Sequence, residues 1–185
     1  MSTIAHVDAA AARRLIAHPS LADEGPQVWA DLGCGDGTFT RALAACLPGG
    51  SHIHAVDRDA AALRAGPARA GAVTIAALVH DFTAEDLPLA DLDGVLIANA
   101  LHYVRDQEGW LTGLPRRMRR RRLLLVEYDS ARANRWVPYP IPLTRARTLV
   151  AAAGFDRIEP LGRRASVYRD ADLYALLATA ANVQR

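Results

Sequence analysis

The stretch VWADLGCGDGTFT, from Val28 to Thr40, decides the fold that the sequence predicts. An apolar run passes through Asp31, three glycines follow at alternate positions, and a helical pattern starts at Thr38. An apolar run that stops at glycines indicates a buried strand, and the pattern after them indicates a helix. Strand, glycine loop and helix in this order begin a βαβ unit that binds a ligand at the loop.

The rest of the sequence repeats this alternation of strand and helix. Strands alternating with helices predict a doubly wound, Rossmann-like α/β fold with a mostly parallel sheet. No helical pattern separates the last two strands, so they should pair antiparallel as a C-terminal hairpin that completes a seven-stranded sheet. Helices are predicted over residues 9–17, 38–47, 59–64, 107–120 and 143–153, and strands over 27–32, 51–57, 73–81, 93–100, 122–129, 155–162 and 172–180.

Length and composition predict one domain. The chain has 185 residues, of which 51% are hydrophobic and 23% charged, as in ordinary globular proteins. We expect a helical cap over residues 1–25 and a ligand-binding core over residues 26–185. No signal peptide or membrane span is evident, so we expect a cytoplasmic protein without membrane partners. The compact chain could form a homodimer in which a second subunit supplies a lid.

The charged residues exclude several kinds of chemistry. All 22 basic residues are arginines, which excludes a Walker-type phosphate lysine and a Schiff-base lysine. Cys34 and Cys46 predict neither a disulfide framework nor a metal site. Six arginines within residues 116–122 suggest nucleic-acid binding. However, the run precedes a strand and so lies about 23 Å from the ligand edge. We interpret it as a solvated face; docking of RNA or an acidic partner is the alternative.

The glycine loop itself indicates the kind of ligand. Asp57 ends the second strand, where an acid can bind both hydroxyls of a ribose. The dinucleotide fingerprint has a third glycine where this chain has Thr38. Asp36 places a carboxylate where a pyrophosphate would need positive partners. A ligand that carries a ribose and a positive charge fits the loop better than a dinucleotide.

These motifs together resemble those of the class I S-adenosylmethionine-dependent methyltransferases, in the family's order over residues 26–180. VWADLGCGDGTFT resembles the first motif, HAVDRD the second, VHDFT the third and DGVLIANALHYV the fourth. The resemblance implies that S-adenosylmethionine binds the loop and leaves as S-adenosylhomocysteine. It also implies ribose binding by Asp57 and adenine binding by Asp81 and the backbone of Phe82. The full set of cofactor residues that we predict is Asp31, Gly33, Gly35, Asp57, Arg58, Asp81, Phe82 and Asn99.

The fourth motif suggests the acceptor. It lacks the Pro-Pro pair of methyltransferases that act on planar nitrogens, and it resembles small-molecule methyltransferases instead. His102 is the candidate general base, because its ordinary pKa lies near neutrality, and Tyr103 is a second candidate. The alternative is that both only shape the loop. Methyl transfer requires no metal, and none is predicted.

A proline- and aromatic-rich loop over residues 130–142 follows the fifth strand and should lie near the acceptor. The residues predicted to contact the acceptor are Glu127, Asp129, Arg135, Trp136 and Tyr139. Packing of the loop against the sheet is the alternative for Trp136. The predicted function is methylation of a small molecule. The alternatives are an RNA or protein methyltransferase that docks through residues 116–122, and a non-catalytic cofactor-binding protein.

Overall fold

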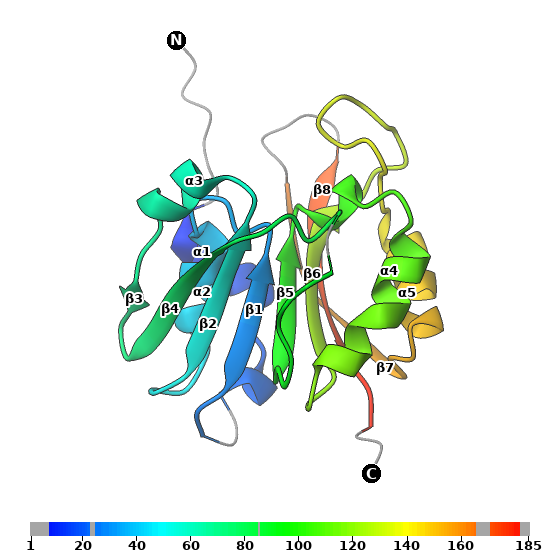
Figure 1. The fold of residues 1–185 in the computed structure, drawn as a ribbon. Helices are drawn as coiled ribbons and strands as arrows, with labels where there is room; N and C mark the ends of the chain where they lie inside the picture. Colours follow the sequence, from blue (N-terminus) through cyan, green and yellow to red (C-terminus); the bar gives the residue numbers. More distant parts are fainter. Residues whose placement is uncertain (1–7, 23–24, 85, 166–170, 182–185) are drawn as a thin grey trace.

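Eight strands form one sheet at the centre of the molecule, in the order β3-β4-β2-β1-β5-β6-β8-β7 (Figure 1). The computed structural model describes residues 8–22, 25–84, 86–165 and 171–181. The strands are β1 (Val28–Leu32), β2 (His52–Asp57), β3 (Arg69–Ala70), β4 (Val73–Val79), β5 (Gly94–Ala98), β6 (Arg122–Tyr128), β7 (Arg157–Ala165) and β8 (Asp172–Thr179). The helices are α1 (Ala9–Ile16), α2 (Thr38–Ala44), α3 (Ala60–Ala65), α4 (Gln107–Gly113) and α5 (Leu143–Ala152).

The predicted fold class is confirmed, with one correction to the number of strands. Strands β4, β2, β1, β5 and β6 run parallel, and β8 pairs antiparallel with both β6 and β7. The prediction of seven strands was wrong because β3, a two-residue strand antiparallel to β4, is too short to show any alternation. The predicted cap over residues 1–25 is described only in part, as α1 and a short turn over residues 19–21.

The helix predicted over residues 107–120 ends early. Helix α4 stops at Gly113, and residues 114–117 form a 3₁₀ turn. Pro115 has no backbone N–H and its ring crowds the preceding turn, which disfavours a continuous α-helix. No helix in the described part of the chain is long and apolar enough to cross a membrane.

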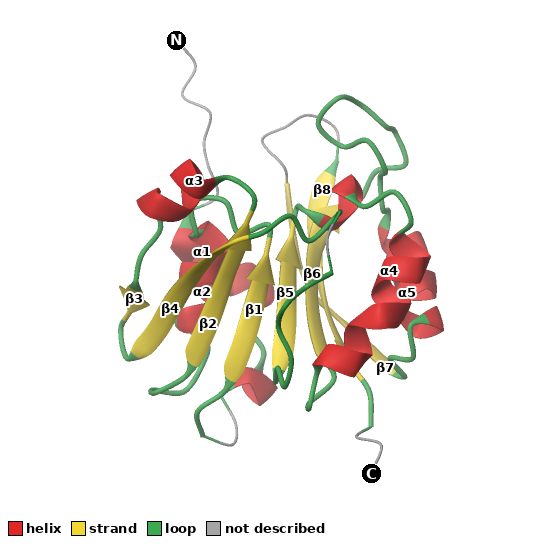
Figure 2. Cartoon of the chain, in the orientation of Figure 1, coloured by secondary structure: helices red, strands yellow, loops and turns green. Residues whose placement is uncertain are grey.

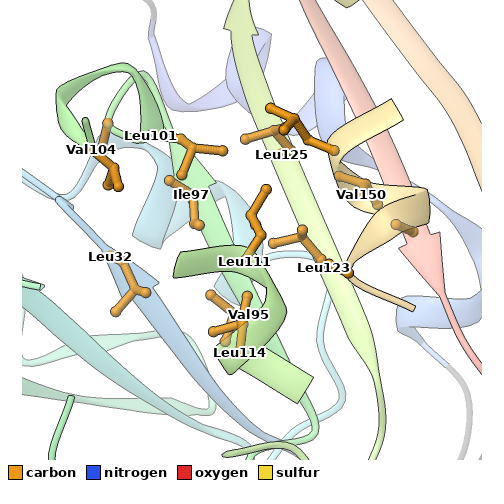
Figure 3. Packing of buried hydrophobic residues seen from close by; sticks show 14 of the residues in the cluster. Leu32, Val95, Ile97, Leu101, Val104, Leu111, Leu114, Leu123, Leu125 and Val150 are labelled. Carbon is orange, nitrogen blue, oxygen red and sulfur yellow. The ribbon is translucent and has the colours of Figure 1, made fainter. Parts of the chain in front are cut away.

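Helices cover both faces of the sheet (Figure 2), and each face has its own apolar core. Helices α4 and α5 pack on one face, where leucine and valine side chains from β5, β6 and the helices meet (Figure 3). Helices α1 and α2 cover the other face, which includes the buried ring of Trp29. The central strands are therefore buried on both sides, which accounts for their nearly continuous apolar sequences.

The arginine run lies at the amino edge of the sheet, as predicted, but much of it is bonded to the protein. Arg119 forms two hydrogen bonds to the buried carboxylate of Asp93, with Nε–Oδ1 and Nη2–Oδ2 distances of 2.8 and 2.5 Å. Arg117 contacts Asp86 and the carbonyl of Leu87. Arg117 and Arg119 are therefore bonded to acids and carbonyls of the protein, although Arg119 remains 52% exposed, as a solvated face implies.

Candidate cofactor and acceptor site

The carboxyl ends of four parallel strands bring the predicted site residues to one edge of the sheet. Gly33 follows β1, Asp57 ends β2, Asn99 follows β5 and Glu127 lies near the end of β6. The chain winds outward in opposite directions from the neighbouring strands β1 and β5. Such a switch point is where open α/β sheets bind ligands, in the crevice beyond the strand ends.

The glycine loop combines close packing on one side with open space on the other. Gly33 has a φ angle of +72°, and a Cβ atom there would lie 2.5 Å from the Cβ of Ala100. Gly35 has a φ angle of +55°, and nothing lies within 4 Å of where its Cβ would be. The loop is therefore pressed against the end of β5 while its Gly35 segment stays accessible to a ligand.

Asp57 is held beside this loop by backbone hydrogen bonds. Its Oδ2 accepts from the N–H of Gly35 at 2.8 Å, and its Oδ1 accepts from the N–H of Asp59 at 2.8 Å. These two bonds leave lone pairs on both oxygens, since each carboxylate oxygen accepts two hydrogen bonds. The geometry fits the predicted binding of two ribose hydroxyls.

Asp31 provides a buried acid beneath the glycine loop. Its side chain is inaccessible to solvent, and its Oδ2 accepts from the hydroxyl of Thr40 at 2.6 Å. Oδ1 has no hydrogen-bond partner among the described residues. Burial raises the pKa of Asp31 to about 7; the Thr40 hydrogen bond opposes the rise, and the charge of Asp57 adds to it. A positively charged ligand would relieve this unfavourable burial.

Asn99 presents a second unsatisfied acceptor at the end of the neighbouring strand. Its side-chain oxygen is buried without a partner in the described part of the chain. Its φ angle is +53°, a left-handed conformation that asparagine tolerates better than most residues. A polar ligand at this edge would satisfy the amide.

The third motif forms a turn that leaves one acid oxygen available. Asp81 Oδ1 accepts from the hydroxyl of Thr83 at 2.6 Å and from its N–H at 3.0 Å. These bonds lower the pKa of Asp81. Oδ2 lies 3.7 Å from Nη1 of the exposed Arg58 side chain. Phe82 is buried, and its carbonyl accepts from the Trp110 indole at 2.9 Å. Asp81 can therefore receive a ligand donor beside an anchored ring.

A buried histidine–glutamate pair lies on the other side of the switch point. His102 follows β5 in a 3₁₀ turn over residues 101–103, and only 2% of it is exposed. Its Nδ1 lies 2.8 Å from Oε2 of Glu127, and its backbone N–H donates to Oε1 of the same residue at 3.1 Å. Glu127, which we expected to contact the acceptor, instead lies against His102 with both oxygens engaged.

Two tyrosine rings lie near His102. The Tyr103 ring centroid lies 4.4 Å from that of His102, and the Tyr128 centroid lies 6.2 Å away. Tyr103 is 44% exposed. Partial burial raises the pKa of Tyr103, although Arg58 opposes the rise. Its hydroxyl is therefore protonated near neutral pH, so Tyr103 suits a contact surface better than a base.

The loop over residues 130–142 is anchored at its carboxyl end, and its tip is exposed. The N–H of Tyr139 donates to the carbonyl of His102 at 3.1 Å. The side-chain amide of Gln107, a residue that was not predicted to belong to the site, donates to the carbonyl of Tyr139 at 2.7 Å. Trp136 is 70% exposed, and the Arg135 guanidinium lies 5.3 Å from its ring centroid. Of the predicted loop contacts, only Tyr139 bonds the backbone of the 101–103 turn.

One further predicted residue, Asp129, has structural partners, and Cys34 in the glycine loop is not activated. Asp129 accepts from the N–H of Leu143 at 2.9 Å and pairs with Arg163, so it fixes the start of α5. Burial and the charge of Asp31 raise the pKa of Cys34, so this thiol is not activated as a nucleophile. No cluster of three metal-binding side chains occurs within the described ranges.

About half of the chain is similar to known proteins, and this half holds the glycine loop and the second to fourth motifs. Residues 30–120 match the model of a family described as a methyltransferase domain. Uncharacterized methyltransferases of Mycobacterium tuberculosis and Mycobacterium bovis are 37% identical over 90 residues. The match covers 49% of this chain and 44% of each relative, so the chain spans less than half of the length of these curated relatives.

Solved structures share the fold over most of the chain. The N-terminal domain of EvdMO1, crystallised with S-adenosylhomocysteine bound, superimposes with a TM-score of 0.64 at 21% identity, covering 85% of this chain and 76% of that one. An S-adenosylmethionine-dependent methyltransferase from Aquifex aeolicus gives a TM-score of 0.63 at 14% identity, covering 92% and 93%. Residues 30–120 thus match a methyltransferase domain, and the fold around them is the fold of solved S-adenosylmethionine-dependent methyltransferases.

Proposed function

We propose that this chain binds S-adenosylmethionine and transfers its methyl group to a small molecule. The observation that carries the proposal is the buried oxygen of Asp31, which has no hydrogen-bond partner among the described residues and lies beneath an accessible glycine loop. S-adenosylmethionine carries a sulfonium and an ammonium group, and either positive charge would stabilise the ionised form of Asp31. The same ligand has a ribose for Asp57 and an adenine amino group for Asp81.

The cofactor brings its own methyl group and leaving group, so the protein mainly has to position the reactants and exclude water. The glycine loop, Asp57 and Asp81 would hold the cofactor on the β1 side of the switch point. The 101–103 turn and the anchored part of the 130–142 loop would hold the acceptor on the β6 side. Both groups of residues lie at the carboxyl edge of the sheet, and the arginine run lies at the opposite edge, which supports a small acceptor.

Docking of RNA or protein through the arginine run has weaker support. Arg119 is bonded to Asp93, Arg117 to Asp86, and Arg122 to the carbonyl of Ser20 at 3.3 Å. The run also lies at the edge of the sheet opposite the glycine loop. A non-catalytic binding protein would share the cofactor site, and turnover distinguishes it from an enzyme.

The cofactor assignment is tested by calorimetry on Asp57→Asn. The substitution removes the charge and one acceptor oxygen, so we expect the Kd for S-adenosylhomocysteine to rise roughly tenfold to a hundredfold, as for hydrogen bonds to charged groups. The control is Asp59→Ser, which keeps an N-cap for α3 but leaves Asp57 in place. Equal affinities of the Asp57→Asn variant and the wild-type protein would contradict the ribose assignment.

The acceptor class is tested by incubating the protein with methyl-labelled S-adenosylmethionine and fractionated cell extract. We expect the label in the small-molecule fraction. Label confined to RNA or protein fractions would overturn the small-molecule proposal, and cofactor binding without any labelled product would indicate a non-catalytic protein.

A further inference from the structure

The pairing of His102 with Glu127 fixes which ring nitrogen can take up a proton. A carboxylate oxygen can only accept a hydrogen bond, so Nδ1, at 2.8 Å from Glu127 Oε2, carries the ring proton. The lone pair is therefore on Nε2. No hydrogen bond to Nε2 occurs within the described ranges, which leaves this nitrogen available to a ligand.

The burial of the pair indicates a role beyond stability. Glu127 and His102 are 1% and 2% exposed. Removing two polar side chains from water costs several kcal/mol, and well-packed apolar residues often stabilise a core at least as well. The second hydrogen bond, from the His102 backbone to Glu127 Oε1, also fixes the main chain of the turn. Ring and backbone are thus held by one carboxylate, an arrangement typical of an oriented base.

A base is needed only for some methyl acceptors. Neutral amines attack through an existing lone pair, and carboxylic acids are already ionised near neutral pH. Thiols ionise readily, since their pKa lies near 8.5. A phenol-type hydroxyl has a pKa of about 10, so it is still protonated at neutral pH and, of these four acceptors, benefits most from a base.

The rings near His102 fit an aromatic acceptor. Tyr103 and Tyr139 are 44% and 38% exposed, so each offers part of its surface. The Tyr103 ring lies against His102, and the Tyr139 backbone is bonded to it. Aromatic walls with a few directed polar groups are typical of sites for flat, apolar ligands.

We infer that the acceptor is a phenol-type hydroxyl, that His102 Nε2 takes its proton, and that Glu127 is a positioning residue for His102. This inference rests on the proposed function. The acceptor oxygen forms a bond to the methyl carbon while the carbon–sulfur bond breaks and its electron pair stays on sulfur. The hydroxyl proton moves to Nε2, and the resulting imidazolium is stabilised by Glu127. The products are the aryl methyl ether and S-adenosylhomocysteine.

The test uses the full chain, labelled S-adenosylmethionine and a series of substituted phenols that differ in acidity, with an aniline and a thiophenol for comparison. We expect methylation of the phenols. In Glu127→Gln, an amide N–H can donate to Nδ1 and so shift the ring proton to Nε2. We therefore expect kcat/KM to fall about 100-fold or more for weakly acidic phenols. The fall in kcat/KM should be smaller for phenols that are already ionised at the assay pH.

The matched control is Glu159→Gln. Glu159 forms the other histidine–glutamate pair of the described chain, with His18 at 3.4 Å on the surface, and its loss should leave the rates unchanged. A loss of the same size for every phenol would show a merely structural role of Glu127. Methylation of the aniline or thiophenol but of no phenol would overturn the inference, as would cofactor binding without turnover of any phenol.

Two further measurements test the inference independently of the activity of Glu127→Gln. The ring-nitrogen NMR spectrum of the wild-type protein should show the proton of neutral His102 on Nδ1, and a proton on Nε2 would overturn the inference even if Glu127→Gln does not fold. Calorimetry with S-adenosylhomocysteine tests cofactor binding separately from the role of Glu127. Absence of binding means that the proposed function has failed, whereas unchanged binding with no effect of Glu127→Gln means that only the present inference has failed.

Discussion

At the scale of single residues, Asp31 shows how a binding site differs from an ordinary core position. Its carboxyl group is buried, and one oxygen has a single short hydrogen bond while the other has none among the described residues. Such a group lowers the stability of the protein without its ligand, because ionisation is unfavourable in a dry environment. Retaining an acid here is consistent with a positively charged ligand above it.

Asp31 should make stability fall as the pH rises towards neutrality. Its pKa is about 7 in the folded protein and 3.8 ordinarily, so between these values the folded state holds a proton that the unfolded state has released. The free energy of unfolding therefore falls across this window and levels off above it. Asp31→Asn should remove this contribution. The free energies of unfolding of the wild-type protein and of Asp31→Asn are measured in urea at pH 5 and pH 8. An equal change between the two pH values in both proteins would contradict the prediction.

At the scale of elements, the sheet depends on a close contact between β1 and β5. The indole of Trp29 is fully buried and lies over Gly94. A Cβ atom at Gly94 would approach three indole carbons to within 2.4–2.6 Å. The glycine that starts β5 is thus required by packing, not by an unusual backbone angle.

Gly94→Ala should destabilise the protein by about 1–3 kcal/mol, the usual cost of overpacking a core. Gly113→Ala is the matched control, because nothing lies within 4 Å of its Cβ position and its φ angle is −76°. Alanine is the better helix former, so this variant should gain roughly 0.5–1 kcal/mol. Urea midpoints compare the two. Equal stability of both variants would show that the indole can move aside.

The same scale shows what the sequence could predict. The positions of the glycine loop after β1 and of Asp57 at the end of β2 were predicted correctly. Both depend on local sequence patterns that mark where a strand ends. The bond between His102 and Glu127 was not predicted, although both were expected at this edge. It depends on the parallel register of β5 with β6, which pairs Ala98 with Val126. Register between strands that are distant in sequence leaves no mark in either segment.

The direction in which side chains of the 130–142 loop point could not be predicted from the sequence either. Trp136 was expected to contact the acceptor, but the Asn134 side chain accepts from the N–H groups of Trp136 and Val137 at 2.8 and 2.9 Å. This local turn holds the indole in solvent. The composition of a loop indicates that rings are available, whereas hydrogen bonds within the loop decide where they point.

At the scale of the whole molecule, the two edges of the sheet differ in what their residues do. The carboxyl edge carries the candidate site, and the amino edge is held together by Asp93. This buried acid accepts from the N–H of Val28 at 2.7 Å and pairs with Arg119 and, at 3.3 Å, with Arg120. It thereby joins the starts of β1 and β5 to the segment that leads into β6.

Loss of Arg119 should make the protein more sensitive to acid. Burial opposes ionisation of Asp93, but hydrogen bonds from Arg119 and the Val28 N–H outweigh it and lower its pKa. A lowered pKa in the folded state contributes stability above the ordinary value, and this contribution is lost as the pH falls through the folded value. Arg119→Ala should cost about 1 kcal/mol at neutral pH, since the arginine is half exposed and screened.

The measurement is an acid titration of folding followed by circular dichroism. The midpoint of Arg119→Ala should lie at higher pH than that of the wild-type protein. Arg116→Ala is the control, because Arg116 is exposed and belongs to the same run. Identical midpoints of the two variants would mean that Arg120 alone suffices to hold Asp93 ionised.

The contact between Gly33 and Ala100 ties together the two halves of the candidate site. With 2.5 Å between a Cβ at Gly33 and that of Ala100, no side chain can separate the glycine loop from the segment that leads to His102. The loop that would hold the cofactor is therefore in direct contact with the segment that leads to the turn that would face the acceptor. A substitution within residues 101–103 that moves Ala100 towards Gly33 would therefore also disturb the cofactor loop, because the two backbones have no room to approach further.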